Sequence, residues 1–158
     1  MSPALARAAE LATPTPAVRT DAIYVVFTTL DDTLSAVRVA DEFAGSLGVP
    51  ITVVHFRTVP YAVPVEEAGG ISPIETELFV KRLRATGKDV QLRVYLCRDE
   101  LRSVPSAFKP HSVIVIAGHR SWWPTHAERL RRALEAAGHF VVFVDPSEHA
   151  AEKEASHA

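Results

Sequence analysis

The sequence predicts an α/β fold of the Rossmann-like kind, an open five-stranded parallel sheet with helices on both faces. Short apolar runs, rich in β-branched and aromatic residues, alternate along the chain with amphipathic stretches of helical length. This alternation implies right-handed crossovers between parallel strands. The chain has 158 residues, 47% of them hydrophobic, which suffices for one buried core. We therefore expect a single α/β domain.

The predicted strands are short runs without internal proline, bounded by turn or helix signals. Runs that are apolar almost throughout favour central positions in a parallel sheet, because both faces of such strands are covered. The first and fourth runs have this character. The five predicted strands span residues 22–28, 50–56, 90–96, 112–117 and 139–144.

The predicted helices are marked by capping residues at their starts and glycines at their ends. Residues 31–48 begin with two aspartates able to cap free amides, carry a broad apolar side and end at Gly48. The connection at 97–111 contains two prolines, which predicts only a short helix there.

Two further helices, at 72–87 and 125–138, share one design. Each begins with a hydroxyl residue followed three places later by glutamate, which is the signature of a capping box, and each ends at a glycine. The residues concerned are Ser72 with Pro73, Glu75 and Gly87, and Thr125 with Glu128 and Gly138.

The two ends of the chain are polar and rich in alanine, without a sustained hydrophobic period. We expect a flexible lead over residues 1–20, the α/β domain over 21–146 and a flexible tail over 147–158. The first twenty residues lack the continuous apolar segment of a signal peptide. These features predict a cytoplasmic protein.

Composition argues against several classes of partner. A formal net charge of -2 and a pI near 6.4 give no general attraction to nucleic acid. No apolar run approaches the roughly 20 residues needed to span a bilayer, so we expect no direct membrane insertion. The single cysteine, Cys97, excludes an internal disulfide, and with Arg98 beside it is either a slightly activated thiol or, as we favour, an unreactive one.

In an open parallel sheet, ligands collect beyond the carboxyl ends of the strands, where the strand order reverses. The candidate rim comprises residues 28–33 and 117–125. Asp31 and Asp32 in the first segment would repel an anion. They match either the acidic metal pocket of a response-regulator receiver or simple helix capping, and we favour capping because no lysine follows the fifth strand.

The second rim segment, AGHRSWWPT, holds one glycine, Gly118, where a phosphate-binding loop would hold several. The polar residues His119, Arg120 and Ser121 are candidates for contact with an anion. The two tryptophans, Trp122 and Trp123, either clasp a partner or stack on a base, or, as we favour, at least one of them packs against the sheet.

The sequence contains no signature of catalysis or of a bound metal. Its seven histidines form no helical HxxxH pair, although two of them, His119 and His126, could approach each other near the rim. No GxSxG motif occurs, and no Ser/His/Asp set is signalled by spacing. We therefore expect a protein that is not an enzyme and has no cofactor or metal.

Two long segments resemble the universal stress protein family. They are IYVVFTTLDDTLSAVRVADEFAGSLGVPITVVHF, with the family's strand, helix and strand lengths, and SVIVIAGHRSWWPTHAERLRRALEAAGHFVVFV, with its fourth strand, loop, helix and fifth strand. The resemblance covers residues 22–145 and is weakest in the middle. It implies strand order 3-2-1-4-5.

This sequence departs from the family at the residues that would bind ATP. The family's adenine-side aspartate and the glycine after it fall on Thr28 and Thr29. The glycines of its Gly-x-x-Gly motif fall on Ala117 and Arg120, and its final Gly-Ser/Thr pair falls near residues 124–125, with a shortened gap. The resemblance therefore implies a domain that has lost ATP binding, while atypical phosphate contacts through His119 and Arg120 remain the alternative.

The resemblance also implies a homodimer formed by pairing of the fifth strands, which agrees with the apolar character of a strand otherwise left at a sheet edge. Some relatives are fused to or serve transporters and kinases, so the expected protein partner is of that class. The expected function is a non-catalytic regulatory or stress-related module. The residues predicted at the dimer edge are Val141, Val142, Phe143 and Val144.

Overall fold

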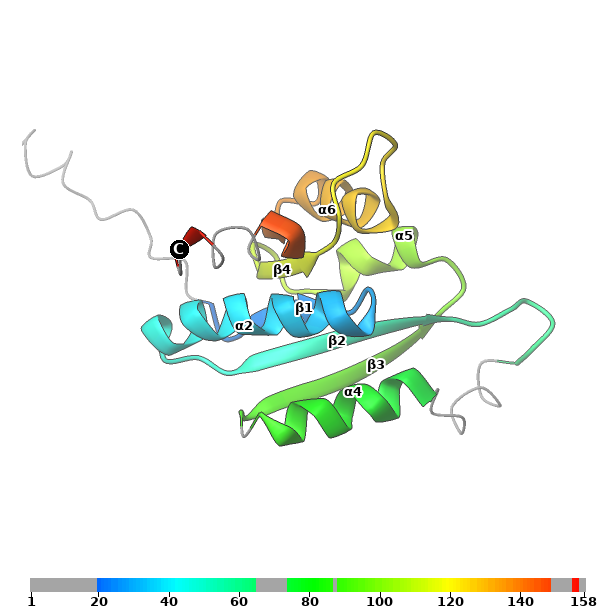
Figure 1. Ribbon diagram of the computed structural model, residues 1–158. Helices are drawn as coiled ribbons and strands as arrows, with labels where there is room; N and C mark the ends of the chain where they lie inside the picture. The colour runs from blue at the N-terminus through cyan, green and yellow to red at the C-terminus, as the bar shows by residue number, and fades with distance from the viewer. Residues whose placement is uncertain (1–19, 65–73, 87, 149–154, 157–158) are drawn as a thin grey trace, which may run out of the picture.

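The protein forms one parallel sheet flanked by helices (Figure 1). The structure is a computed structural model and describes residues 20–64, 74–86, 88–148 and 155–156. The strands are β1 (Ile23–Val26), β2 (Ile51–Thr58), β3 (Val90–Cys97), β4 (Val113–Ala117) and β5 (Phe140–Val144). The helices are α2 (Leu30–Leu47), α4 (Ile74–Ala85), the short α5 (Glu100–Ser103) with its 3₁₀ continuation η1 (Val104–Ala107), and α6 (His126–Ala136).

The five strands are all parallel and lie in the order β3-β2-β1-β4-β5, which confirms the predicted topology. The central strand, β1, pairs with β2 on one side and β4 on the other, with Ile23 opposite both Ile51 and Val113. The outer strands are β3 and β5. The chain reverses direction across the sheet between β1 and β4, which is the place where this class of sheet binds ligands.

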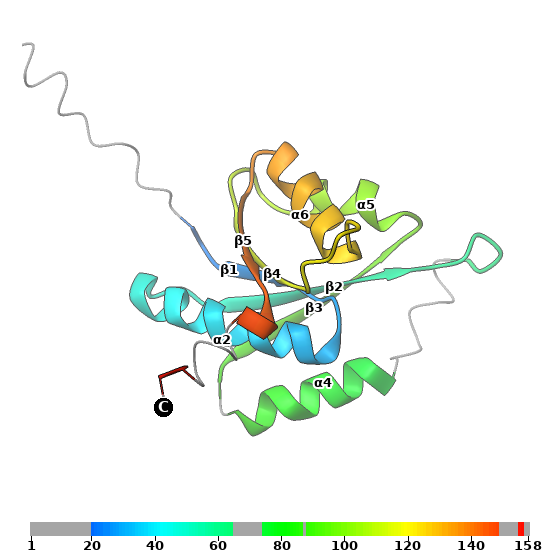
Figure 2. The same ribbon diagram turned by 45° about the horizontal axis from the view of Figure 1, so that its top comes forward.

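Two apolar cores lie on opposite faces of the sheet, and successive β1 side chains alternate between them. Val25 packs in the core beneath α2 and α4, whereas Val26 packs in the core beneath α5, η1 and α6. Figure 2 shows the two helix groups on either side of the sheet. Two of the fully buried residues are Phe79 of α4 and Leu130 of α6, so each helix group contributes large side chains.

The start of α2 differs from the prediction by its cap. We expected Asp31 and Asp32 to cap the helix, but the N-cap is Thr29, whose hydroxyl accepts a hydrogen bond from the Asp32 amide at 3.3 Å. The two aspartates lie in the first turn, where their charge is favourable to the helix dipole. The predicted end is confirmed, because Gly48 adopts the left-handed conformation at φ 67°.

The structure describes some of the other predicted helix ends and not the rest. The predicted capping box of α6 is confirmed, with the Glu128 amide donating to the Thr125 hydroxyl and the Thr125 amide donating to the Glu128 carboxylate. The short helix expected in the third connection is also confirmed as α5 and η1. Ser72, Pro73 and Gly87 lie outside the described residues.

The predicted terminal segments lie largely outside the part of the chain that the structure describes. Residues 1–19, 149–154 and 157–158 are not described. Within the described ranges, no helix is both long and apolar enough to cross a membrane.

Candidate functional site

The two predicted rim segments meet at the carboxyl ends of neighbouring strands. Residues 28–33 follow β1, residues 117–125 begin at the last residue of β4, and these two strands are paired. A residue that we had not placed at the rim, Asp145, joins them, because it follows β5 and β5 pairs with β4. The residues that follow β1, β4 and β5, which are neighbours in the sheet, therefore lie along the same edge.

The threonines at the end of β1 are engaged in bonds within the protein. The Thr28 hydroxyl donates to the Ala117 carbonyl at 2.9 Å, which ties the end of β1 to the end of β4. The Thr28 amide donates to the Thr33 hydroxyl at 3.1 Å, and Thr29 caps α2. These bonds fix the local backbone and occupy both donors of Thr28.

The single glycine of the loop, Gly118, allows α6 and β5 side chains to pack closely against the loop backbone. A Cβ atom on Gly118 would lie 2.4 Å from the Cβ of Ala127 and 3.5 Å from the ring of Phe143. The Gly118 amide donates to the Val144 carbonyl at 3.0 Å. Gly118 therefore lets the first turn of α6 lie directly against the end of β4, and the space that a phosphate would need beside it is filled by protein.

A histidine lies between two carboxylates in the mouth of the rim. His119 Nε2 is 3.5 Å from Asp32 Oδ1, and His119 Nδ1 is 3.7 Å from Asp145 Oδ1. The side chains of Asp32 and Asp145 are only 12% and 6% exposed, whereas that of His119 is 61% exposed. This Asp32–His119–Asp145 bridge links the start of α2, the loop before α6 and the end of β5.

Asp145 is held in its charged form by several donors. Its Oδ1 atom accepts hydrogen bonds from the amide, at 3.0 Å, and the hydroxyl of Ser147, and its Oδ2 atom accepts from the Arg120 amide at 3.1 Å. The Ser147 hydroxyl is the main cause of the lowered pKa of Asp145, followed by the two amides and His119 against an opposing effect of burial. A charged, nearly buried carboxylate at this point repels phosphate.

The Arg120 side chain lies against β5. Its guanidinium carbon is 5.9 Å from the centroid of the Phe143 ring, and the guanidinium carbon of Arg131 lies 5.8 Å from the same ring. Because the Arg120 amide already donates to Asp145, neither polar part of this residue is aimed at a cradle for phosphate. The neighbouring Ser121 is exposed.

Both tryptophans of the loop are exposed, which corrects our expectation that at least one packs against the sheet. Trp122 is 92% exposed and Trp123 is 76% exposed, and their loop projects beyond the start of α6 (Figure 1). The physical reason lies at Gly118, where Ala127 and Phe143 already fill the space next to the end of β4.

The two histidines that we expected near the rim have different partners: His119 lies between Asp32 and Asp145, and His126 pairs with α5. Its Nε2 atom lies 2.9 Å from a carboxylate oxygen of Glu100 at the start of α5. Burial raises the pKa of Glu100, and His126 opposes that rise. Among the described residues, no group of three or more His, Cys, Asp or Glu side chains is arranged to hold a metal ion.

Cys97, at the end of β3, is buried and is not an activated thiol. Burial is the main cause of its raised pKa, and the nearby Glu100 carboxylate raises it further. Its thiol lies 3.7 Å from the Arg57 carbonyl. The neighbouring Arg98 donates to the carbonyls of Val59 and Pro60 and does not stabilise a thiolate.

The chain is similar in structure to a universal stress protein from Archaeoglobus fulgidus, with a TM-score of 0.53 and 20% sequence identity. The match covers 77% of this chain and 91% of the archaeal chain. The chain has the universal stress protein fold. Searches against models of protein families and against curated protein sequences find no match. The universal stress protein fold agrees with the resemblance found in the sequence, and its strand order is the one observed.

The rim differs from the ATP-binding pattern that the resemblance in the sequence implies. The positions where the resemblance places phosphate-binding glycines hold Ala117, Arg120 and, near the final Gly-Ser/Thr pair, Pro124. Across the same opening lies the Asp32–His119–Asp145 bridge. The arrangement presents buried negative charge at the mouth and exposed aromatic surface beside it.

Proposed function

We propose that this protein is a universal-stress-protein-like regulatory module, cytoplasmic and non-catalytic, that has lost ATP binding and acts through dimerisation and protein contacts. The observation that carries the proposal is the Asp32–His119–Asp145 bridge across the rim. Phosphate groups bind where backbone amides point outward and positive charge is available. At this rim two carboxylates lie nearly buried, and the Arg120 amide is bonded to one of them.

The second candidate is a nucleotide-binding protein with atypical phosphate contacts through His119 and Arg120. Both ring nitrogens of His119 face carboxylates, and the Arg120 guanidinium lies over the Phe143 ring. Binding of ATP through these residues would require both to leave their present partners. The geometry therefore favours the first proposal.

Native mass spectrometry with and without excess ATP and magnesium distinguishes the two functions. Under the first proposal we expect no nucleotide adduct and no rise in melting temperature, since a ligand that binds only the folded form stabilises it by mass action. ATP or AMP binding that disappears in Arg120→Ala would establish the second candidate and overturn the first. Binding that survives in Arg120→Ala would overturn the first proposal and also the proposed role of Arg120.

The exposed tryptophans are the proposed contact for a protein partner, of which a transporter or kinase is the expected class. Large aromatic side chains contribute strongly to the binding free energy at interfaces, and here they are available without rearrangement of the core. We expect Trp122→Ser combined with Trp123→Ser to change the free energy of unfolding by less than about 0.5 kcal/mol, because both side chains are exposed.

The same double variant tests the contact. Affinity capture from the native cell extract is expected to retain a protein with the wild-type chain and to lose it with the double variant, at unchanged melting temperature. Equal capture by both chains would show that the tryptophans do not make the contact.

The proposed dimer pairs the β5 strands through their open edges. The Phe140 amide donates to the Ser112 carbonyl, so amides of even-numbered β5 residues point toward β4. The amides of Val141 and Phe143 therefore point to the open edge. An apolar strand left unpaired at an edge is exposed to association, which supports pairing of Val141, Val142, Phe143 and Val144 with a second copy.

Val141→Pro is expected to convert the dimer to a monomer in size-exclusion chromatography with light scattering. Proline removes one outward amide and leaves the bonds to β4 intact, and edge strands tolerate it. Val141→Ala, which keeps the amide, is the matched control and should remain dimeric. A dimer that persists in Val141→Pro would place the interface elsewhere.

A further inference from the structure

The outer edge of β3 is the longer of the two open edges of the sheet. β3 has 8 residues and β5 has 5, and within the described part of the chain β3 pairs with β2 alone. The Val59 amide donates to the Cys97 carbonyl, so odd-numbered β3 residues direct their backbone groups to β2. The even-numbered residues from Val90 to Leu96 therefore direct their amides and carbonyls outward, where another strand can pair with them.

The side chains of β3 do little to prevent such pairing. Leu92 packs against the core beneath α2 and α4, and Val94 lies on the same face of the sheet, where it is 44% exposed. On the opposite face Tyr95 is 37% exposed. The strand contains no proline and one charged residue, Arg93. Long edge strands are usually protected by proline, bulges or several charges, so the β3 edge is suited to association.

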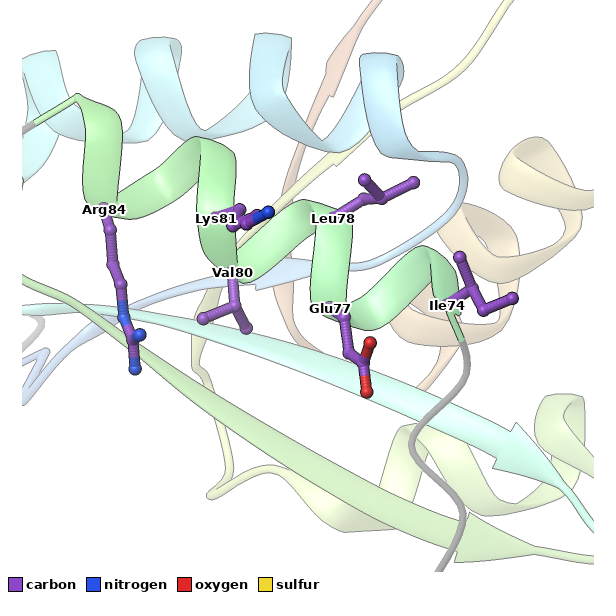
Figure 3. Close-up of a pocket in the computed structure, with 6 residues that line it drawn as sticks. All are labelled: Ile74, Glu77, Leu78, Val80, Lys81 and Arg84. Atoms are coloured by element: carbon purple, nitrogen blue, oxygen red, sulfur yellow. The ribbon is translucent and has the colours of Figure 1, made fainter.

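The side of α4 next to this edge carries a row of side chains with a charge toward each end. Glu77, Val80 and Arg84 point to the side of α4 away from α2 (Figure 3). Lys81, one turn from Glu77, points to another side of the helix. None of the ion pairs among the described residues includes Glu77 or Arg84. The row therefore has an unpaired acid toward one end, valine in the middle and an unpaired base toward the other.

A two-fold axis beside β3 brings each of these charges opposite its counterpart. In a symmetric pair, residue i of one copy contacts residue j of the other, and j contacts i. With the two α4 helices antiparallel, Glu77 of each copy faces Arg84 of the other, and Val80 lies near the axis. The midpoint of the row is about 7 Å from the end of α4, at 1.5 Å per residue. A shift of about 7 Å along β3 from Val90 reaches Leu92.

A register centred on Leu92 also suits the β3 strands themselves. The outward backbone groups of Leu92 meet those of the other Leu92, and the groups of Val90 meet those of Val94 on the second copy. The exposed Val94 side chain is then covered by a valine. Arg93 lies opposite Gln91 and not opposite a second arginine, so like charges do not meet.

We propose that the β3 edge and the adjoining side of α4 bind a second copy of this chain. The two β3 strands pair antiparallel about Leu92, and Glu77 of each copy pairs with Arg84 of the other. A second copy is favoured over a foreign strand because the complementary charges are both present on this chain. The contact goes beyond the proposed function and uses neither the rim nor β5. Since β3 and β5 are opposite edges of the sheet, both contacts can form in one molecule.

A hollow along α4 agrees with this contact. It has a volume of about 350 Å³, and Glu77, Val80 and Arg84 are among the residues that line it (Figure 3). The residues that line it all come from α4, so it has one described wall. The α4 helix of the second copy would supply the facing wall.

Sedimentation equilibrium of Val141→Pro tests this contact separately from β5 pairing. This variant is expected to be a monomer at the dilution of a chromatography column, and to form a dimer through β3 in concentrated solution. Adding Glu77→Arg places two arginines opposite each other and should weaken the association roughly ten- to a hundredfold. Arg132→Glu, a charge reversal at an exposed position of α6 on the other face of the sheet, is the matched control and should associate normally.

A mixture of two charge-reversed chains tests the pairing itself. In the Val141→Pro background, Arg84→Glu alone should weaken self-association as Glu77→Arg does. An equal mixture of the two should associate again, because opposite charges then meet across the axis, and a chain with both changes should also recover. All of these positions are exposed, so the melting temperature should stay that of Val141→Pro.

The outcomes separate this contact from the β5 dimer. If Val141→Pro still elutes as a dimer, the β5 interface is wrong, and loss of that dimer in Glu77→Arg would assign it to β3. A Val141→Pro chain that is monomeric at every concentration would overturn the β3 contact and leave the β5 dimer standing. Association that is unchanged by the single reversals, or not recovered in the mixture, would also overturn it.

Discussion

Gly118→Ala is expected to lower the free energy of unfolding by about 3 kcal/mol, the upper part of the usual range for overpacking a core. The new Cβ would lie 2.4 Å from the Cβ of Ala127, closer than two carbon atoms can approach. Neither atom belongs to a flexible side chain, so relief requires α6 to move away from β4. That movement would strain the Gly118 amide bond to the Val144 carbonyl and disturb Phe143.

Urea denaturation measures this loss, and two variants make the result specific. Ala127→Gly introduced together with Gly118→Ala removes the facing Cβ and should restore part of the stability, despite the cost of glycine in a helix. Gly45→Ala, in α2, meets no atom within 4 Å and should raise the free energy of unfolding by about 0.5–1 kcal/mol. A stable Gly118→Ala protein would mean that α6 is held less closely than described.

The fold was predictable because its determinants are local. The apolar runs mark the strands, and the Thr125–Glu128 capping box and Gly48 mark helix ends, each by contacts between residues that are near in sequence. Sheet order is not local, and it came from resemblance to a known family. Structural similarity at 20% identity supports the same order.

The sequence predicted which segments form the rim but not the contacts between their charged side chains. The carboxyl ends of β1 and β4 follow from the fold, so Thr28 and Gly118 were correctly located at the rim. The bridge joins Asp32, His119 and Asp145, which are far apart in sequence, and no short motif signals such pairing. The position of Asp145 directly after a predicted strand was the available signal, since every strand end of a parallel sheet contributes to the same edge.

The prediction that at least one tryptophan packs against the sheet was wrong, and the reason lies in the packing around the loop. Trp122 and Trp123 are large enough to fill a core, and large aromatics most often do so. The core next to their loop is already complete, because Phe143 comes from β5 and Ala127 from α6. The packing of this loop thus depends on α6 and β5, which come later in the chain. Residues 117–125 by themselves therefore do not predict whether the tryptophans are buried.

Asp145→Asn is expected to lower the free energy of unfolding at pH 7 by about 2–3 kcal/mol, the range for hydrogen bonds to a charged group. The asparagine oxygen can still accept from Ser147, but its amide nitrogen would then face the Arg120 amide, and two donors cannot pair. The contact of the Asp145 carboxylate with His119 would also be altered. Asp89→Asn, at an exposed aspartate, is the matched control.

The pH dependence of this difference follows from the lowered pKa of Asp145. A carboxyl whose pKa is lower in the folded state contributes its full stability above its unfolded pKa, near 3.9, and loses it as the pH falls through the folded value. The gap between wild type and Asp145→Asn, measured by urea denaturation, should therefore be constant from pH 7 to about pH 5 and shrink below about pH 4. A gap that stayed constant in acid would mean that shape, not charge, holds the rim together.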